Sequence, residues 1–160
     1  MSERIKIDAE RCCSESYREM KARQQEEVNA FPMAFAFTQG QFAEGMRKLG
    51  LEPFETDKIL SIGGGGFILK ADSDSYRALF RRHYLEREAA MAGDKDGSGY
   101  LYQMFRAELS DHEYGYTRDP DSALQALGIT LEQLEQDDRI ACAFLTACKD
   151  EAAWYDKHFC

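Results

Sequence analysis

Four consecutive glycines at positions 63–66 restrict the fold of this chain more than any other feature. Apolar runs at 59–62 and 67–70 flank them on both sides. Glycine has no Cβ, so it adopts the positive backbone dihedrals that a tight reversal requires. The stretch therefore predicts a β-hairpin with the glycines at its turn.

Helices are predicted on both sides of the hairpin. Asp72, Ser73 and Asp74 offer side-chain oxygens to the free amides of a helix start at about 73. Thr38 with Gln41 forms a capping-box pattern that opens a helix over 39–49. The helix that starts at about 73 is expected to continue to 91, because large residues recur there at helical spacing: Tyr76, Leu79, Phe80, His83, Tyr84 and Met91.

The N-terminal part adds a helix and a further strand. Residues 8–30 are dense in charged and amide side chains and predict a long solvated helix, preceded by a frayed end at 1–7. Pro32 ends that helix, and residues 33–37 alternate large and small side chains, which is typical of a strand. Together with 58–62 and 67–70, this segment predicts a small antiparallel sheet of three strands.

The C-terminal half reads as helical. A helix is predicted over 100–112, antiparallel to the 73–91 helix because the connection is short, and 114–117 is expected to be a loop. Short helices should start at Pro120 and Thr130, and Asp138 should cap the last helix. A core-facing stripe is predicted in that helix: Ile140, Phe144, Ala147, Cys148, Ala152 and Tyr155. The predicted class is α+β, with the sheet packed by helices.

Composition places the chain among small globular proteins. Its 160 residues, 44% of them hydrophobic, fit a single domain over 1–160 with a compact α+β core at 31–160. The five cysteines are odd in number and lack CxxC spacing, which argues against a disulfide framework and a zinc ribbon. The longest apolar run, 31–37, is too short for a membrane span, and no secretion signal is evident. A cytoplasmic location and no membrane partner are expected.

The net charge of −9 is concentrated in the second half. Between residues 106 and 138 there are nine acidic and two basic side chains. Such a field repels phosphates and attracts cationic surfaces. We therefore expect no direct nucleic-acid binding and a protein partner with a basic surface.

Tyrosines accompany these acidic residues. Tyrosine suits an interface because it offers apolar area and a hydroxyl at little cost in rotamer entropy. The predicted partner-binding residues are Tyr100, Tyr102, Asp111, Glu113, Tyr114, Tyr116, Asp119 and Asp121.

The turn that precedes them resembles part of a calcium loop. Asp94, Asp96 and Ser98 occupy the first, third and fifth positions of an EF-hand pattern, but its twelfth position is Phe105 instead of glutamate. A plain helix-to-helix turn explains the same residues. A calcium-stabilised module stays open as an alternative.

His83 and His112 form a second alternative. Each falls on the apolar side of its predicted helix, and an antiparallel pair of helices would bring them to a similar level. With Asp111 or Glu113 as a third ligand, they could form the metal site of an enzyme or metal-binding protein. The competing interpretation is two packed histidines with satisfied hydrogen bonds.

Several runs of this sequence resemble a known family. They are FPMAFAFTQGQFAEGMRKLGL, DKILSIGGGGFILKADSDSYRALFRRH, YLYQMFRAELSDHEYGYT and ALGIT, within about 31–154. The family is one of small uncharacterised acidic bacterial proteins carried on phage-like or conjugative mobile elements of gut Gram-positive bacteria. The resemblance implies a mobile-element setting and supplies no catalytic residue. It makes a host-defence nuclease or restriction complex a reasonable target, by mimicry of nucleic-acid charge.

These observations favour a non-enzymatic accessory protein without a cofactor. It would bind a protein partner through its acidic, tyrosine-bearing surface. Arg77, Arg81, Arg82 and Arg87 interrupt the acidic character of the chain and argue against strong mimicry of nucleic acid.

Overall fold

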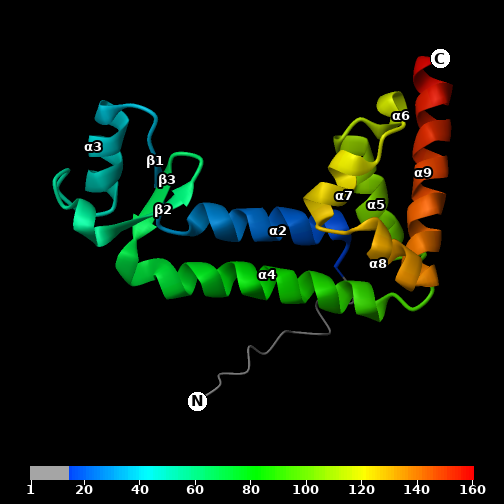
Figure 1. Cartoon of the computed structure of the whole chain (residues 1–160), viewed down its shortest axis with the longest axis horizontal. Coiled ribbons are helices and arrows are strands. Elements are labelled where there is room, and N and C mark those ends of the chain that lie inside the picture. The colour runs from blue at the N-terminus through cyan, green and yellow to red at the C-terminus, as the bar shows by residue number, and fades with distance from the viewer. Residues whose placement is uncertain (1–14) are drawn as a thin grey trace. The chain divides into compact units, whose positions relative to one another are not determined.

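The computed structural model describes residues 15–160, so the predicted frayed end and the predicted helix start at residue 8 lie outside the described residues. The described chain is α+β, as predicted, with a small antiparallel sheet and a helical C-terminal half (Figure 1). Its helices and strands are α2 (Tyr17–Ala30), β1 (Ala34–Phe35), α3 (Gln39–Lys48), β2 (Ile59–Gly63), β3 (Gly66–Leu69), α4 (Ser73–Gly93), α5 (Tyr100–Asp111), α6 (Tyr114–Thr117), α7 (Asp121–Leu127), α8 (Leu131–Gln136) and α9 (Asp138–Phe159). Short 3-10 turns lie at Thr56–Lys58 and Lys70–Asp72.

The described residues divide into two compact units. The sheet unit is residues 24–84, and the helical unit is residues 15–23 with 85–160. Each unit has its own buried apolar cluster, whereas the composition suggested one core. The organisation of residues 1–160 as a single domain stays a prediction.

The sheet unit contains the predicted hairpin. Its three antiparallel strands lie in the order β1-β3-β2, with Ile59 opposite Leu69 and Ala34 opposite Phe67. The first strand covers only two residues instead of the predicted 33–37. Its neighbour Ala36 still donates a backbone hydrogen bond of 2.9 Å to the carbonyl of Gly65, so the pairing continues into the glycine turn.

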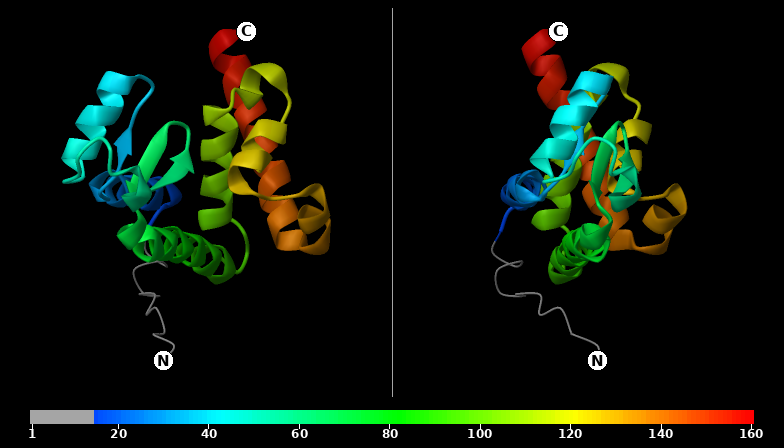
Figure 2. Two further views of the ribbon diagram at one scale, coloured as in Figure 1. Left: turned by 60° about the vertical axis from the view of Figure 1, so that its left-hand side comes forward. Right: turned by 90° about the vertical axis from the view of Figure 1, so that its left-hand side faces the viewer.

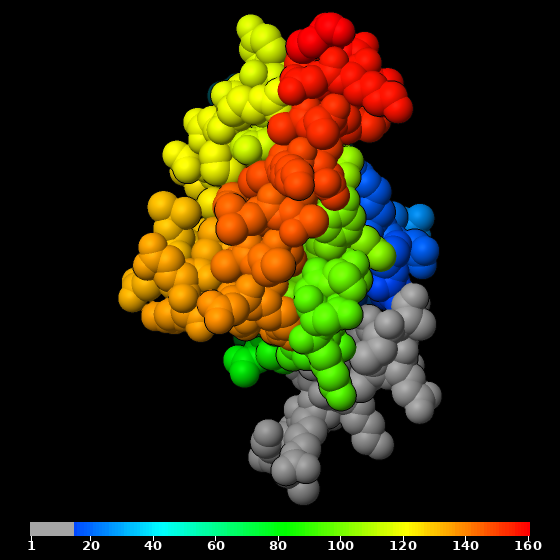
Figure 3. Space-filling model, turned by 90° about the vertical axis from the view of Figure 1, so that its right-hand side faces the viewer, coloured from blue at the N-terminus to red at the C-terminus, as the bar shows by residue number. Residues whose placement is uncertain are grey.

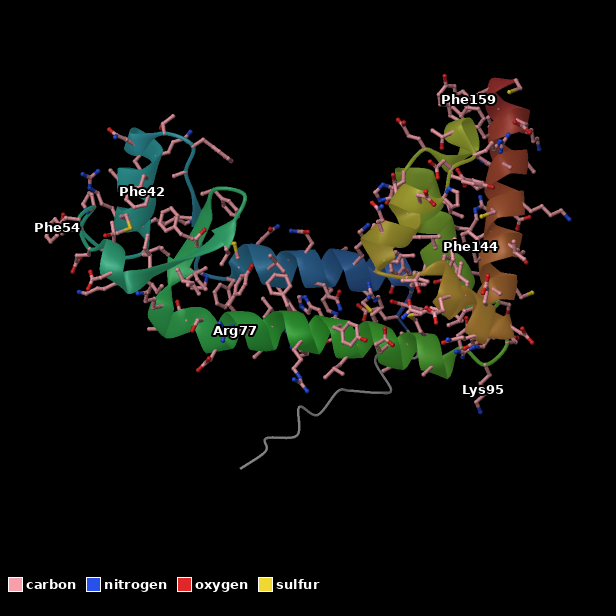
Figure 4. The ribbon with its side chains drawn as sticks, viewed as in Figure 1. Phe42, Phe54, Arg77, Lys95, Phe144 and Phe159 are labelled. Carbon is pink, nitrogen blue, oxygen red and sulfur yellow. The ribbon has the colours of Figure 1, made fainter. Side chains whose placement is uncertain are left out.

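The small side chains of the first strand face the core, and the phenylalanines face outward. Ala34 is buried, whereas Phe35 and Phe37 are 53% and 79% exposed. Helix α3 approaches this strand so closely that a Cβ on Gly45 would lie 2.9 Å from the Cβ of Ala34. Phe42 of α3, labelled in Figure 4, adds a ring contact of 5.2 Å between centroids with Phe67.

We expect alanine substitutions at the glycine turn to separate the cost of backbone strain from the cost of a steric clash. Gly64 and Gly65 both have positive φ, but only at Gly65 would a Cβ clash, at 2.9 Å from the carbonyl oxygen of Ala36. Gly64→Ala should lower the free energy of unfolding by about 1 kcal/mol from backbone strain. Gly65→Ala should lower it by about 2–3 kcal/mol, because the backbone contact is added to the strain. Urea unfolding of both variants checks this difference, and equal losses would contradict the described turn.

The helical unit is built around α5 and α9, which lie side by side (Figure 2). Phe105 of α5 and Phe144 of α9 meet edge to face with centroids 5.4 Å apart. Of the predicted stripe on the last helix, Phe144, Ala147 and Cys148 are buried. The expected antiparallel pairing of α5 with α4 is not the arrangement found, since the extended contacts of α5 are with α9, α7 and α6.

Three local predictions in this unit were wrong in detail. Residues 114–117 form the single-turn helix α6 instead of a loop, because Arg118 donates a 2.8 Å backbone hydrogen bond to Tyr114. Pro120 lies one position before α7. The cap of α9 is Asp137 instead of Asp138, since the Asp137 carboxylate accepts the amide of Arg139 at 3.0 Å.

Candidate functional site

Most of the acidic excess belongs to the helical unit. Its described residues carry eighteen acidic and ten basic side chains, a net charge of −8. The sheet unit carries eight acidic and seven basic side chains, a net charge of −1. The field that favours a cationic partner therefore comes from the helical unit.

Helix α6 is held in a fixed position against α9. Glu113 and Arg118, on either side of it, both have left-handed φ near +60°, which is uncommon for residues with side chains. Between them, Gly115 packs so tightly that a Cβ would lie 2.7 Å from the Cβ of Tyr155. Backbone strain of this kind persists only where surrounding contacts enforce it, and it gathers at functional sites.

A hollow of about 480 Å³ lies beside this turn. We call it the aromatic hollow, and it is lined by Ser110, Glu113, Gly115, Tyr116, Glu151, Trp154, Tyr155 and Phe159. Three of its rings are unusually open for their size, with Tyr116 73%, Phe159 66% and Trp154 44% exposed. Figure 3 shows this face with the end of α9 in red beside the yellow 110–120 segment, and Figure 4 labels Phe159 on the last turn of α9.

A second hollow of about 450 Å³ continues from the first, since Ser110, Glu151 and Trp154 line both. Here Arg106 donates to Glu151 at 3.2 Å and to the hydroxyl of Tyr102 at 2.8 Å. Tyr102 in turn donates to Asp150 at 2.7 Å. Burial, assisted by this bond to Asp150, raises the pKa of Tyr102. The second hollow is therefore lined by charges that already neutralise one another.

The four predicted tyrosines do not form one surface. Tyr100 is buried in the core, where its hydroxyl contacts the sulfur of Met20 at 3.3 Å. Tyr114 is half-buried against the same core, and burial, followed by the neighbouring Cys148, raises its pKa. Tyr102 is held in the network described above. Only Tyr116 presents most of its ring to solvent.

The predicted acidic residues also have different roles. Asp111 accepts from Arg18 at 3.2 Å and lies 3.7 Å from the Lys21 ammonium. Asp119 accepts the backbone amide of Asp121 at 2.9 Å, which orders the start of α7. Within residues 15–160, the carboxylate of Glu113 forms no ion pair or hydrogen bond, and Glu113 lines the aromatic hollow. Of the predicted binding residues, Glu113 and Tyr116 are therefore the two that place a carboxylate and an aromatic ring on the lining of the aromatic hollow.

Sequence reasoning missed Trp154 and Phe159 and assigned Tyr155 to the core stripe. Their signal is the cluster WYDKHF at the end of α9, which contains the single tryptophan of the chain. Three large aromatic residues within six positions exceed what one core-facing stripe can bury, because they point around the helix in several directions.

Glu108 anchors the start of α2 to α5 from a buried position. Its carboxylate accepts from the Tyr17 hydroxyl at 2.5 Å and from Lys21 at 2.6 Å, with His112 Nε2 3.4 Å away. Burial opposes ionisation of Glu108, but the bonds from Lys21 and Tyr17 outweigh it, and the pKa is lowered. Burial and the bond to Glu108 raise the pKa of Tyr17. His112 therefore lies at the edge of a cluster that stabilises the unit.

The two histidines lie in different units. His83, in the sheet unit, is buried with its Nε2 2.9 Å from a carboxylate oxygen of Glu27. His112, in the helical unit, faces Glu108. Among residues 15–160, no group of three or more histidine, cysteine or acidic side chains is arranged to hold a metal ion. The metal-binding alternative stays a prediction.

The oxygens of the calcium-like loop bind backbone groups. Asp94 accepts the amides of Gly99 at 3.1 Å and Leu101 at 3.0 Å, at the start of α5. Asp96 accepts the hydroxyl of Ser98 at 2.6 Å, and the bonds from Ser98 lower its pKa. Phe105, at the twelfth position of the pattern, is a core residue. These contacts are those of a turn that caps a helix.

We expect calcium to leave the melting temperature unchanged. Asp94 and Asp96 already satisfy local donors, and no carboxylate stands at the twelfth position, so an added ion gains too few ligands to stabilise the fold. Thermal unfolding with millimolar calcium and with a chelator checks this result. A clear rise of the melting temperature with calcium alone would support the calcium-stabilised alternative.

In the part of the chain that the structure describes, no helix combines the length and apolar character needed to cross a membrane.

Comparison with known proteins adds a family without an assigned activity. No curated protein and no solved structure matches the chain. A family model described as "Family of unknown function (DUF7659)" matches residues 16–150, which is most of both units. The chain therefore belongs to this family of unknown function, DUF7659.

Proposed function

We propose that this chain is a non-enzymatic accessory protein that binds a protein partner with a basic surface. The binding surface is the aromatic hollow together with the acidic residues around it on the helical unit. The observation that carries the proposal is the set of open rings of Tyr116, Trp154 and Phe159 within a unit of net charge −8. Exposed aromatic anchors beside a field of one sign are typical of a surface that a complementary partner covers.

The packing of the turn that carries Tyr116 supports binding. Tyr116 lies on a turn that is closed by backbone hydrogen bonds and by the contact of Gly115 with Tyr155. The ring of Tyr116 also lies 6.3 Å from that of Tyr155, between centroids. An anchor whose backbone is already ordered loses less conformational entropy when a partner binds.

We further propose which class of partner the protein meets and where it does so. A host-defence nuclease or restriction complex is the class of basic-surfaced partner that the sequence resemblance favours, in a mobile-element context and a cytoplasmic location. Such a partner binds nucleic acid through cationic surfaces, which the acidic helical unit complements.

Differential affinity capture tests the proposal. Wild-type protein and the Tyr116→Ala variant would be immobilised at equal density and exposed to lysate of the encoding organism. We expect a protein with a basic surface to be retained by the wild type, lost from Tyr116→Ala, and released from the wild type by salt. Tyr84→Ala is the matched control, because Tyr84 is also exposed but belongs to the sheet unit. Equal retention by wild type and Tyr116→Ala would contradict the proposed surface.

A further inference from the structure

The residues that line the aromatic hollow favour a positively charged group. Among the described residues that line it, two are carboxylates, four are aromatic and none is basic. The rings make contacts with one another at the end of α9, with Tyr155 stacked on Phe159 at 4.9 Å and Trp154 edge-on to Phe159 at 6.0 Å. Aromatic faces attract cations, and carboxylates do so more strongly.

Its two carboxylates differ in availability. Glu151 is buried and already accepts from Arg106 at 3.2 Å, on the side of the second hollow. Glu113 is exposed, has no ion pair among residues 15–160, and is held by a left-handed backbone at the edge of α6. A cation that entered the hollow would find Glu113 as its carboxylate and the ring of Tyr116 as a wall. Trp154 lines the hollow too, although one face of its ring is already stacked on His158 at 4.5 Å between centroids.

We infer that the aromatic hollow receives an arginine side chain of the partner. This inference rests on the proposed function and names the chemistry of its central contact. A guanidinium group is planar and weakly hydrated, so it stacks on an aromatic ring while its edge donates two hydrogen bonds to one carboxylate. The hollow, of about 480 Å³, has room for a guanidinium group and the backbone that carries it, and its rings and available carboxylate favour arginine over lysine.

The single tryptophan makes the hollow directly observable. Trp154 lines it, and no other tryptophan contributes to the fluorescence of the chain. The probe is a hexapeptide with three arginines, titrated at physiological salt and constant pH. Two peptides of the same length serve as comparisons, one with citrulline, which is neutral and nearly isosteric, and one with lysine, which keeps the charge.

We expect a saturable change of Trp154 fluorescence with the arginine peptide. The citrulline peptide should bind at least 10-fold more weakly, because it retains the shape without the charge. The lysine peptide should bind several-fold more weakly, because its ammonium neither stacks nor donates in a fork. Glu113→Gln should weaken binding of the arginine peptide about 10-fold. Glu132→Gln, which removes the same charge from an exposed position on α8 outside the hollow, should leave it unchanged.

Two results would overturn the inference: equal binding of the arginine and citrulline peptides, or equal losses in Glu113→Gln and Glu132→Gln. The second result would mean that only the general negative field attracts the peptide. If the arginine inference fails while retention of a partner still depends on Tyr116, the proposed surface stands and its ligand chemistry is different. If Tyr116→Ala retains the same partner as the wild type, the proposed function itself fails.

Discussion

Replacing Glu108 with alanine is expected to lower the free energy of unfolding by about 2–4 kcal/mol, as removal of one partner from a buried charged network does. Glu108 is 3% exposed, and its loss leaves the buried Tyr17 hydroxyl without its 2.5 Å acceptor. The cost stays below the upper range for buried ion pairs because the other partner, Lys21, is half exposed and can return to water.

The loss of stability caused by Glu108→Ala should depend on pH in a defined direction. The pKa of Glu108 is lowered in the folded chain, so its ionised form stabilises the fold. This contribution is fully present above the ordinary carboxyl pKa of about 4.3 and disappears as the pH falls through the lower folded value. The difference in stability between wild type and Glu108→Ala should therefore be largest near neutral pH and shrink on acidification.

Chemical denaturation at neutral and acidic pH measures both effects. Glu135→Ala is the matched control, since Glu135 is exposed on α8, and its loss should change stability by no more than about 0.5 kcal/mol. Equal stabilities of the two variants at neutral pH would mean that Glu108 does not anchor α2 to α5.

The hairpin, the capped helices and the fold class could be predicted because local chemistry determines them. The glycines supply the positive φ that a tight reversal needs, and the helix predicted to start at Thr130 does so with a capping box between Thr130 and Gln133. The helix α6 could not be predicted, because Tyr114–Thr117 lacks an apolar period and its turn is enforced by packing of Gly115 on Tyr155. The partner of α5 was also missed, since a short connection suggests a neighbouring helix but tertiary packing of Phe105 on Phe144 decides it.

The candidate site was predicted in part. Net charge identified the acidic half, and tyrosine spacing identified Tyr116, because both are properties of the local sequence. The burial of Tyr100 and the hydrogen bonds of Tyr102 depend on α2 and α9, which lie far away in the chain. For the same reason the contribution of Trp154 and Phe159 appears only when the end of α9 lies beside α6.

Tyr116→Ala is expected to raise the dissociation rate of the partner by about 10- to 100-fold, because truncation of a central aromatic anchor costs about 1.5–3 kcal/mol of binding free energy. Tyr116 is 73% exposed in the free chain, so its loss should leave folding nearly intact. The charges around it should act on association as well. Reversing Glu113 and Asp121 to lysine should slow association, and this effect should shrink as salt shortens the screening length to about 8 Å. The same variant should also speed dissociation, because Glu113 is the inferred carboxylate contact of the partner's arginine. Asp119 is left unchanged because its carboxylate orders the start of α7.

The most direct test of the acidic aromatic surface is a measurement of both rate constants for the captured partner, at low and at physiological salt. The proposed surface predicts faster dissociation for Tyr116→Ala at both salt concentrations, and slower association for the doubly reversed variant that is most marked at low salt. If both variants bind the partner with unchanged kinetics at low salt, the account is contradicted, and the interface should be sought at the glycine hairpin of the sheet unit or on α2.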